Sequence, residues 1–194
     1  MKTNLSSQIT LTRIPLRYYR PENAFEHSVL TRLEKVPTNI YESAEEGSLA
    51  VEKEIATQVR RKQDIGKPFV VALPGGRSPQ SVYKELIRIH KEEQLSFRNV
   101  IAFVEYEFYP LANPSAGNLA RLKAEFFDHI DIDPSNIHCP DGSMPKDSIL
   151  DFCRKYEEMI QWLGGIDCML LGIGSASNIM FNVSGTTISS RTRM

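Results

Sequence analysis

The loop at residues 74–79, with the sequence Pro-Gly-Gly-Arg-Ser-Pro, has the residue types and spacing of an anion-binding site. Gly75 and Gly76 permit backbone torsions that turn two peptide N–H groups toward a bound group without a Cβ in the way. Ser78 is a favourable N-cap and Pro79 a favourable first residue of a helix, whose positive N-terminus would face the anion. Arg77 adds a full positive charge. We predict that these residues (Gly75, Gly76, Arg77 and Ser78) hold a phosphate group.

The same loop is also compatible with a plain turn between a strand and a helix. Glycines followed by a helix start are a common way for an α/β protein to change direction, so the spacing alone leaves both interpretations open. The loop lacks the Gly-Lys-Ser/Thr ending of a P-loop and the glycine spacing of a dinucleotide-binding loop. A phosphate bound here would therefore belong to a small metabolite rather than to a nucleotide.

A second group of reactive side chains, Glu105, Tyr106 and Glu107, follows the apolar run at residues 100–104. Open α/β sheets bind ligands at the carboxyl ends of their strands. In an extended backbone Glu105 and Glu107 share one face, and Tyr106 takes the other. Glu107 is a candidate proton carrier, with a solvated or helix-capping carboxylate as the alternative. A tyrosine with an ordinary pKa of about 10 is a poor base at neutral pH.

The elements expected to position these groups alternate between strands and helices. Buried strands are predicted at residues 69–73, 100–104 and 166–171, with a short leading strand at 39–42. Helices are predicted at residues 43–62, 80–93, 118–130 and 148–163. In the first helix Leu49, Val51, Ile55 and Val59 are expected to face the core. This order predicts a doubly wound, mainly parallel, Rossmann-like sheet with helices on both faces.

The first 38 residues are expected to form an N-terminal extension with a short helix, in front of an α/β domain at residues 39–194. Arg13, Arg17 and Arg20, with two tyrosines between them, make the start of this extension basic. Such a pattern can bind nucleic acid, but three arginines are few. We prefer an arm that packs on its own domain or on a neighbouring subunit.

The composition excludes several classes of function. The formal net charge is -1, which gives no reason to expect a nucleic-acid or membrane partner. No apolar run is long enough for a membrane span, and the N-terminus lacks the apolar core of a signal peptide, so a cytoplasmic protein is expected. Three cysteines without CxxC spacing fit reduced thiols, and four scattered histidines suggest no metal site.

The sequence resembles the glucosamine-6-phosphate deaminase family, which shares its fold with 6-phosphogluconolactonase. Residues 73–79, Leu-Pro-Gly-Gly-Arg-Ser-Pro, are similar to the family's phosphate loop, Leu-Pro-Thr-Gly-Gly-Thr-Pro. The likeness continues through residues 83–86, 90–100, 126–132, 156–157, 172–174 and 190–193. It therefore extends from residue 40 to the end of the sequence without a large gap.

The resemblance implies a cofactor-free conversion of glucosamine 6-phosphate to fructose 6-phosphate and ammonia. The family's proton-carrying Asp lies in the motif Asn-Met-Asp-Glu-Tyr, where Tyr106 takes its place here and Glu107 matches the next position. The ring-opening His and its two acidic neighbours correspond to Asn178, Ala176 and Val183. Asn, Ala and Val cannot act as general bases. All four catalytic positions are therefore substituted, while the surrounding framework is kept.

The resemblance also implies that further strands and phosphate-binding cations lie beyond Met194 in full-length relatives. This chain would then carry the N-terminal portion of the family domain, incomplete at its C-terminus, and we expect a homo-oligomer or packing with a further C-terminal domain. Thr186 and Arg193 match regulatory-site positions of hexameric deaminases, with an ordinary capped turn as the alternative.

Three functions follow from these observations. The first is the family's deamination and isomerisation of an amino-sugar phosphate, with impaired catalysis. The second is sugar-phosphate binding, or a structural role, without catalysis. The third is a lactonase activity, which would also rely on the histidine that Asn178 replaces.

Overall fold

The computed structural model describes residues 23–32, 36–174, 176, 178–187 and 189–193. The chain divides into two units, residues 1–47 and 48–194, which are described separately. The first unit contains the expected short helix, α1 (Ala24–Thr31), whose N-cap Asn23 accepts a hydrogen bond from the Glu26 N–H. The basic segment with Arg13, Arg17 and Arg20 lies outside the described residues.

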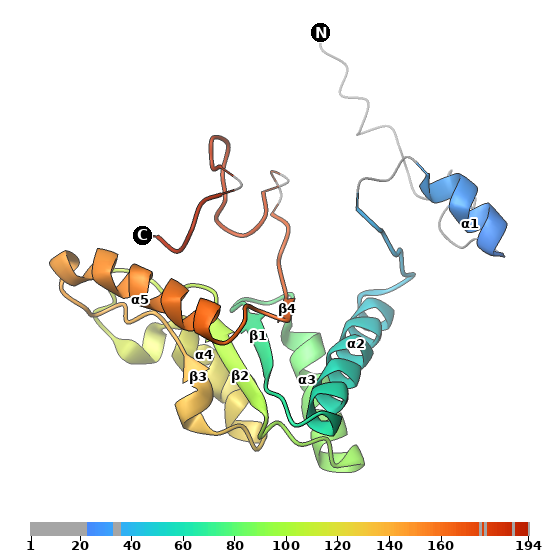
Figure 1. The fold of residues 1–194 in the computed structure, drawn as a ribbon, viewed down its shortest axis with the longest axis horizontal. Helices are drawn as coiled ribbons and strands as arrows, with labels where there is room; N and C mark the ends of the chain where they lie inside the picture. Colours follow the sequence, from blue (N-terminus) through green and yellow to red (C-terminus); the bar gives the residue numbers. More distant parts are fainter. Residues whose placement is uncertain (1–22, 33–35, 175, 177, 188, 194) are drawn as a thin grey trace, which may run out of the picture. The chain divides into compact units, whose positions relative to one another are not determined.

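A four-stranded parallel sheet forms the centre of the second unit (Figure 1). Its strands are β1 (Phe69–Leu73), β2 (Val100–Val104), β3 (Ile137–His138) and β4 (Cys168–Met169), in the order β3-β2-β1-β4. The central pair is in register from Phe69 opposite Val100 to Leu73 opposite Val104. The prediction of a doubly wound parallel sheet is confirmed, and so are the bounds of its two central strands.

The outer strands differ from the sequence-based expectation. Residues 39–42 form no strand, and the run at 166–171 contributes only two residues to the sheet. This run lies at an edge of the sheet, and its residues Met169 and Leu171 are 47% and 44% exposed. The prediction that the run is buried on both faces is therefore wrong. Strand β3 was not predicted, because it lies in a polar segment and pairs through only two residues.

Helices cover both faces of the sheet, as predicted. They are α2 (Ala44–Asp64), α3 (Gln80–Glu93), α4 (Asn118–Glu125) and α5 (Ile149–Trp162). Short 3-10 turns occupy Pro114–Ala116, Phe127–His129, Pro134–Asn136 and Lys146–Ser148. Helix α4 is shorter than predicted because Phe126 leaves the helical region, with φ -146° and ψ -62°.

Alternate residues of the central strands point into two separate cores. Val71, Leu73 and Val104 belong to the larger core, which packs against α2, α3 and α4. Val70, Ala72 and Phe103 belong to a smaller core under α5, where Tyr156 is also buried. In α2 the core face is Ser48, Glu52, Ile55, Ala56 and Val59. Leu49, which was expected to face inward, is 46% exposed.

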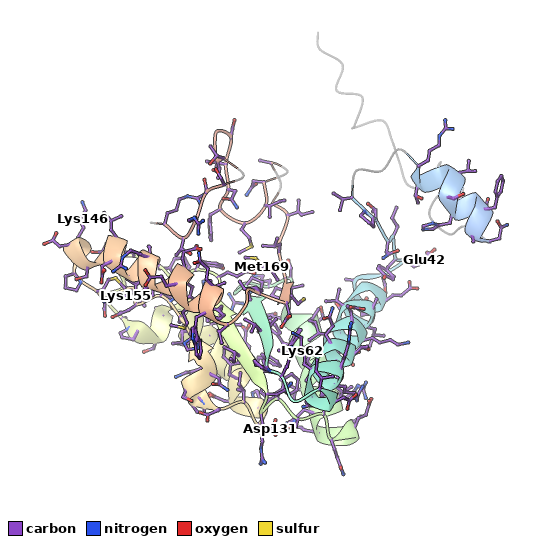
Figure 2. The ribbon with its side chains drawn as sticks, viewed as in Figure 1. Glu42, Lys62, Asp131, Lys146, Lys155 and Met169 are labelled. Atoms are coloured by element: carbon purple, nitrogen blue, oxygen red, sulfur yellow. The ribbon has the colours of Figure 1, made fainter. Side chains whose placement is uncertain are left out.

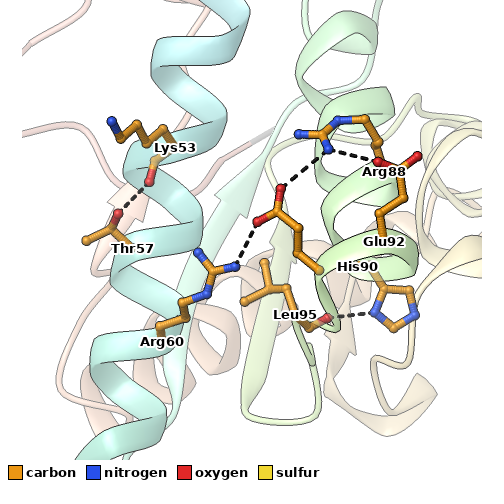
Figure 3. Close-up of polar contacts among 8 residues, drawn as sticks. Lys53, Thr57, Arg60, Arg88, His90, Glu92 and Leu95 are labelled. Carbon is orange, nitrogen blue, oxygen red and sulfur yellow. Dashed lines mark hydrogen bonds and ion pairs between the residues drawn. The ribbon is translucent and has the colours of Figure 1, made fainter.

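Polar contacts join α2 to α3 at two places, one of which, at Arg60, is drawn in Figure 3. Ser48 and Ser81 share a hydrogen bond of 2.6 Å between their hydroxyl oxygens. Arg60 of α2 pairs with Glu93 of α3 at 3.3 Å, and within α3 Arg88 pairs with Glu92 at 3.0 Å. Surface ion pairs contribute little stability each, so the Arg60–Glu93 pair orients α3 on α2 more than it stabilises the fold. The predicted anion-binding loop, residues 74–79, directly precedes helix α3.

Strand β4 is anchored to the sheet by Asp167. One oxygen of its carboxylate accepts a hydrogen bond from the Val70 N–H at 3.0 Å, and the other pairs with Lys62 of α2 at 2.6 Å. Lys62 and Met169 are labelled in Figure 2. This contact places residues 170–174 beside the loop that follows β1.

Candidate functional site

A cavity of about 320 Å³ opens at the carboxyl ends of β1 and β4. The predicted anion-binding residues Gly75, Gly76, Arg77 and Ser78 all line it, together with Tyr106. The opposite wall is apolar and comes from residues 170–174, Met180 and Phe181. The structure therefore places the four loop residues in one cavity beside the N-terminus of α3, where backbone N–H groups and the helix dipole favour an anion.

Both glycines of the loop are required by the local geometry. Gly76 has φ +109°, which other residues rarely adopt. A Cβ at Gly75 would overlap the side-chain amide of Asn118, whose Cγ would be 2.7 Å away. Asn118 is buried, and its amide donates a hydrogen bond to the Tyr106 carbonyl at 3.1 Å. Asn118 therefore connects the loop after β1 to the segment after β2.

We expect Gly75→Ala to lower the free energy of unfolding by about 1–3 kcal/mol, because the buried Asn118 side chain must move. The double variant Gly75→Ala/Asn118→Ala removes the obstructing amide, so its loss should be smaller than the sum of the two single losses. Urea unfolding of all four proteins measures this coupling. Additive losses would contradict the close packing of Gly75 on Asn118.

The start of helix α3 differs from the prediction. Pro79 is the N-cap residue, with φ -80° and ψ -5°, and the helix begins at Gln80 without a side-chain cap. Ser78, predicted as the N-cap, lies one residue earlier in the turn and is exposed. Its hydroxyl makes no capping bond because the Pro79 carbonyl begins the helical pattern by accepting from the Tyr83 N–H at 3.0 Å.

Tyr106, at the position of the family's proton-carrying Asp, forms an aromatic wall of the cavity. Its ring meets that of Phe181 edge to face, with centroids 4.6 Å apart at an interplanar angle of 78°. Phe108 packs on it in the same manner, with centroids 6.1 Å apart. Such pairs hold aromatic rings in fixed orientations. Tyr106 is thus placed for contact with a ligand, in an apolar setting.

Asn178, at the position of the family's ring-opening His, stabilises a turn. Its side-chain amide donates to the Met180 carbonyl at 2.6 Å, and its own carbonyl accepts from the Gly174 N–H at 2.8 Å. Ala176 and Val183, at the positions of the acidic neighbours, are exposed. This segment therefore shapes one wall of the cavity and brings no titratable side chain to it from these positions.

The Glu107 carboxylate caps helix α4. One carboxylate oxygen accepts from the Phe108 and Asn118 N–H groups at 2.9 and 2.8 Å, and the other from the Leu119 N–H at 3.1 Å. Cys139 lies on the same carboxylate, and burial together with the Glu107 charge raises the pKa of its thiol to about 12. The capping role named as the alternative for Glu107 is the one that the geometry shows, and Glu107 does not line the phosphate-loop cavity.

Glu105 is the residue that the sequence analysis undervalued. Both of its carboxylate oxygens are buried, and neither has a hydrogen-bond partner among the described residues. Burial raises the pKa of this carboxyl to about 8. The sequence held one indication of this. Glu105 aligns with the Met of the family's Asn-Met-Asp-Glu-Tyr motif, so an ionisable residue occupies a position that is apolar in the motif.

The two predicted regulatory-site positions lie in the segment that follows the cavity wall. The Thr186 N–H donates to the Val183 carbonyl at 3.0 Å, which fits a turn. Arg193 donates to the Asn182 side chain at 2.7 Å. The neighbouring Thr192 bonds through its N–H and hydroxyl to Glu157 of α5, at 2.8 and 2.6 Å.

Comparison with known proteins identifies the family. Residues 42–177 match the model of the glucosamine-6-phosphate isomerases/6-phosphogluconolactonase family. A glucosamine-6-phosphate deaminase-like protein of Bacteroides thetaiotaomicron is 60% identical over the whole chain, which covers 29% of that protein. The glucosamine-6-phosphate deaminase of Porphyromonas gingivalis is 42% identical over 66% of this chain and 48% of its own length.

A solved structure extends the match to the fold. A monomeric glucosamine-6-phosphate deaminase superposes with a TM-score of 0.72 at 33% identity, covering 79% of this chain and 61% of its own. The chain therefore spans about half or less of the curated relatives named above. From its sequence, its parallel fold and these matches, the chain belongs to the glucosamine-6-phosphate isomerase/6-phosphogluconolactonase family, on the deaminase branch.

Proposed function

We propose that this chain binds a hexosamine phosphate such as glucosamine 6-phosphate without catalysing its deamination by the family's route. The observation that supports binding is the convergence of Gly75, Gly76, Arg77 and Ser78 on one cavity at the N-terminus of α3. Peptide N–H groups, a helix dipole and a guanidinium suit a phosphate monoester.

The chemistry of the cavity supports the absence of turnover. Among the described residues that line it, none is Asp, Glu or His. Moving a proton between adjacent carbons needs a base within hydrogen-bond reach of the substrate. Tyr106 is packed against Phe181, and Glu107 accepts backbone hydrogen bonds at the start of α4. A sugar phosphate in this cavity would therefore be held without a group that takes its proton.

Removal of the loop's positive charge tests the binding site. We expect Arg77→Gln to weaken the binding of glucosamine 6-phosphate by about 3- to 10-fold, because one charge-assisted contact to the phosphate is lost. Isothermal titration calorimetry measures the affinity for glucosamine 6-phosphate, and glucosamine serves as the comparison ligand without a phosphate. Arg98→Gln is the matched control: it removes the same charge from an exposed side chain next to β2 at the opposite end of the sheet. Equal affinity of the parent protein for glucosamine and its phosphate would refute the proposal.

The identity of the chain to deaminases makes the family reaction the second candidate. An ammonia-release assay with glucosamine 6-phosphate separates the two. We expect turnover no faster than that of a Tyr106→Phe/Glu107→Gln variant. Faster turnover by the parent chain would establish catalysis and make one of these residues responsible for it.

A further inference from the structure

A second cavity, of about 120 Å³, lies beside the first half of α5. Glu105 and Glu107 line it from the segment after β2, Ile149 and Phe152 from α5, and Arg193 from the end of the described chain. It shares only Tyr106 with the phosphate-loop cavity. A ligand here would be independent of the phosphate site.

Three charged side chains around this cavity already have partners. Glu107 caps α4, Asp141 accepts from the Ser143 N–H at 2.8 Å, and Arg193 bonds to Asn182. Both oxygens of Glu105, in contrast, are buried without a partner in the described part of the chain. Because unpaired buried polar groups are costly, native structures rarely keep them without a ligand or water.

The surroundings of Glu105 favour an organic cation over a metal ion. No group of three or more His, Cys, Asp or Glu side chains suited to a metal occurs among the described residues, and a hard divalent cation needs several oxygen ligands. With Glu105 neutral, the charged side chains on the cavity wall are two carboxylates, Glu107 and Asp141, against one guanidinium, Arg193. An ammonium group has the charge and the N–H donors that both oxygens of Glu105 require.

We propose that this cavity binds the ammonium group of a small primary amine, with Glu105 as its anionic partner and with Ile149 and Phe152 around the alkyl stem. The volume admits a short aliphatic amine and excludes a nucleotide or a drug-sized molecule, whose pockets are several times larger. Nothing in this proposal depends on sugar-phosphate binding.

Proton release is the distinguishing property of such a site. Burial keeps Glu105 protonated at neutral pH, since its pKa is raised to about 8. The amine arrives as its ammonium ion, the carboxyl loses its proton to the buffer, and an ion pair forms. Tyr83 of α3 and Tyr156 of α5, on whose hydroxyls the Glu105 charge acts, stay neutral because burial raises their pKa values. Close to one proton should therefore be released for each amine bound at pH 7.

Calorimetry with n-propylammonium chloride tests the proposal on the full chain. Titrations in two buffers of different ionisation enthalpy, at an ionic strength matched with KCl, report both affinity and proton release. We expect saturable binding with nearly one proton released, and a loss of at least about tenfold in affinity in Glu105→Gln. 1-Propanol, which has the same stem without the charge, should not bind.

Three results would overturn the proposal. They are the absence of saturable heat with n-propylammonium, equal binding by 1-propanol, and binding that Glu105→Gln leaves unchanged. Glu105→Met serves as a second variant if the Gln variant folds poorly. Binding of glucosamine 6-phosphate by the Glu105 variants, measured in parallel, shows that the phosphate site is intact and separates this proposal from the proposed function.

Discussion

Replacing Glu105 with methionine should stabilise the protein by about 2–4 kcal/mol above pH 8 and have little effect near pH 4. The carboxyl has a pKa raised to about 8 by burial, against an ordinary value of 4.5. Between these two pH values the folded protein keeps a proton that the unfolded chain releases. The stability of the parent protein therefore falls as the pH rises through this window, and the methionine variant is free of that loss.

The measurement is a series of urea unfolding curves of both proteins from pH 4 to pH 9. The difference in unfolding free energy should grow through the window and level off above pH 8. His138, whose pKa is lowered by burial, is common to both proteins, so its contribution to the pH dependence largely cancels. Methionine fits the site because its stem is of similar length and apolar. A difference that is constant with pH would show that the pKa of Glu105 is the same in the folded and the unfolded protein.

The second large effect is expected for Glu107→Ala, which should lower the unfolding free energy by about 2–4 kcal/mol. The substitution removes a carboxylate that accepts hydrogen bonds from three backbone N–H groups, two of them at the start of α4. A lost N-cap alone costs about 1 kcal/mol, and charge-assisted bonds that leave donors unpaired cost more. The loss should appear as a lower urea midpoint.

Glu158→Ala is the matched control for Glu107→Ala. It removes a carboxylate that pairs with Arg154 on the exposed side of α5, where both side chains are more than half exposed. Such surface pairs contribute little, so the control should change stability by less than about 0.5 kcal/mol. Equal effects of the two substitutions would mean that the Glu107 carboxylate does not support α4.

The central part of the fold could be predicted from the sequence because its signals are local. Unbroken apolar runs marked β1 and β2 to the residue, and helical periodicity marked α3 and α5 to within one residue. Strands β3 and β4 escaped correct prediction because two-residue pairings depend on neighbours distant in the sequence. For β4 the deciding contact is Asp167 with Val70, nearly one hundred residues apart.

The phosphate loop of the candidate site could be predicted from the sequence, whereas the roles of the carboxylates after β2 could not. Gly76 is required by its positive φ and Gly75 by the close approach of Asn118, so the two glycines in the sequence indicate a tight loop at this position. The roles of Glu105 and Glu107 depend on what surrounds each carboxylate after folding. Of Glu105, Tyr106 and Glu107, only Tyr106 lines the phosphate-loop cavity, whereas all three line the second cavity. Sequence alone cannot show that the Glu107 carboxylate lies at the first N–H groups of α4.

The two walls of the phosphate-loop cavity differ in how firmly they are attached. One wall follows β1, which pairs with β2 along its full length. The other wall follows β4, which is attached to β1 by the pairing of two residues and by the hydrogen bond from the Val70 N–H to the Asp167 carboxylate. Segments with few buried contacts open locally at a lower free energy than the core does. The wall at residues 170–174, Met180 and Phe181 should therefore exchange its amide hydrogens faster than the loop opposite. A ligand that contacts both walls would slow the exchange mainly in this wall. Affinity for such a ligand would then include the entropy of ordering the weaker wall.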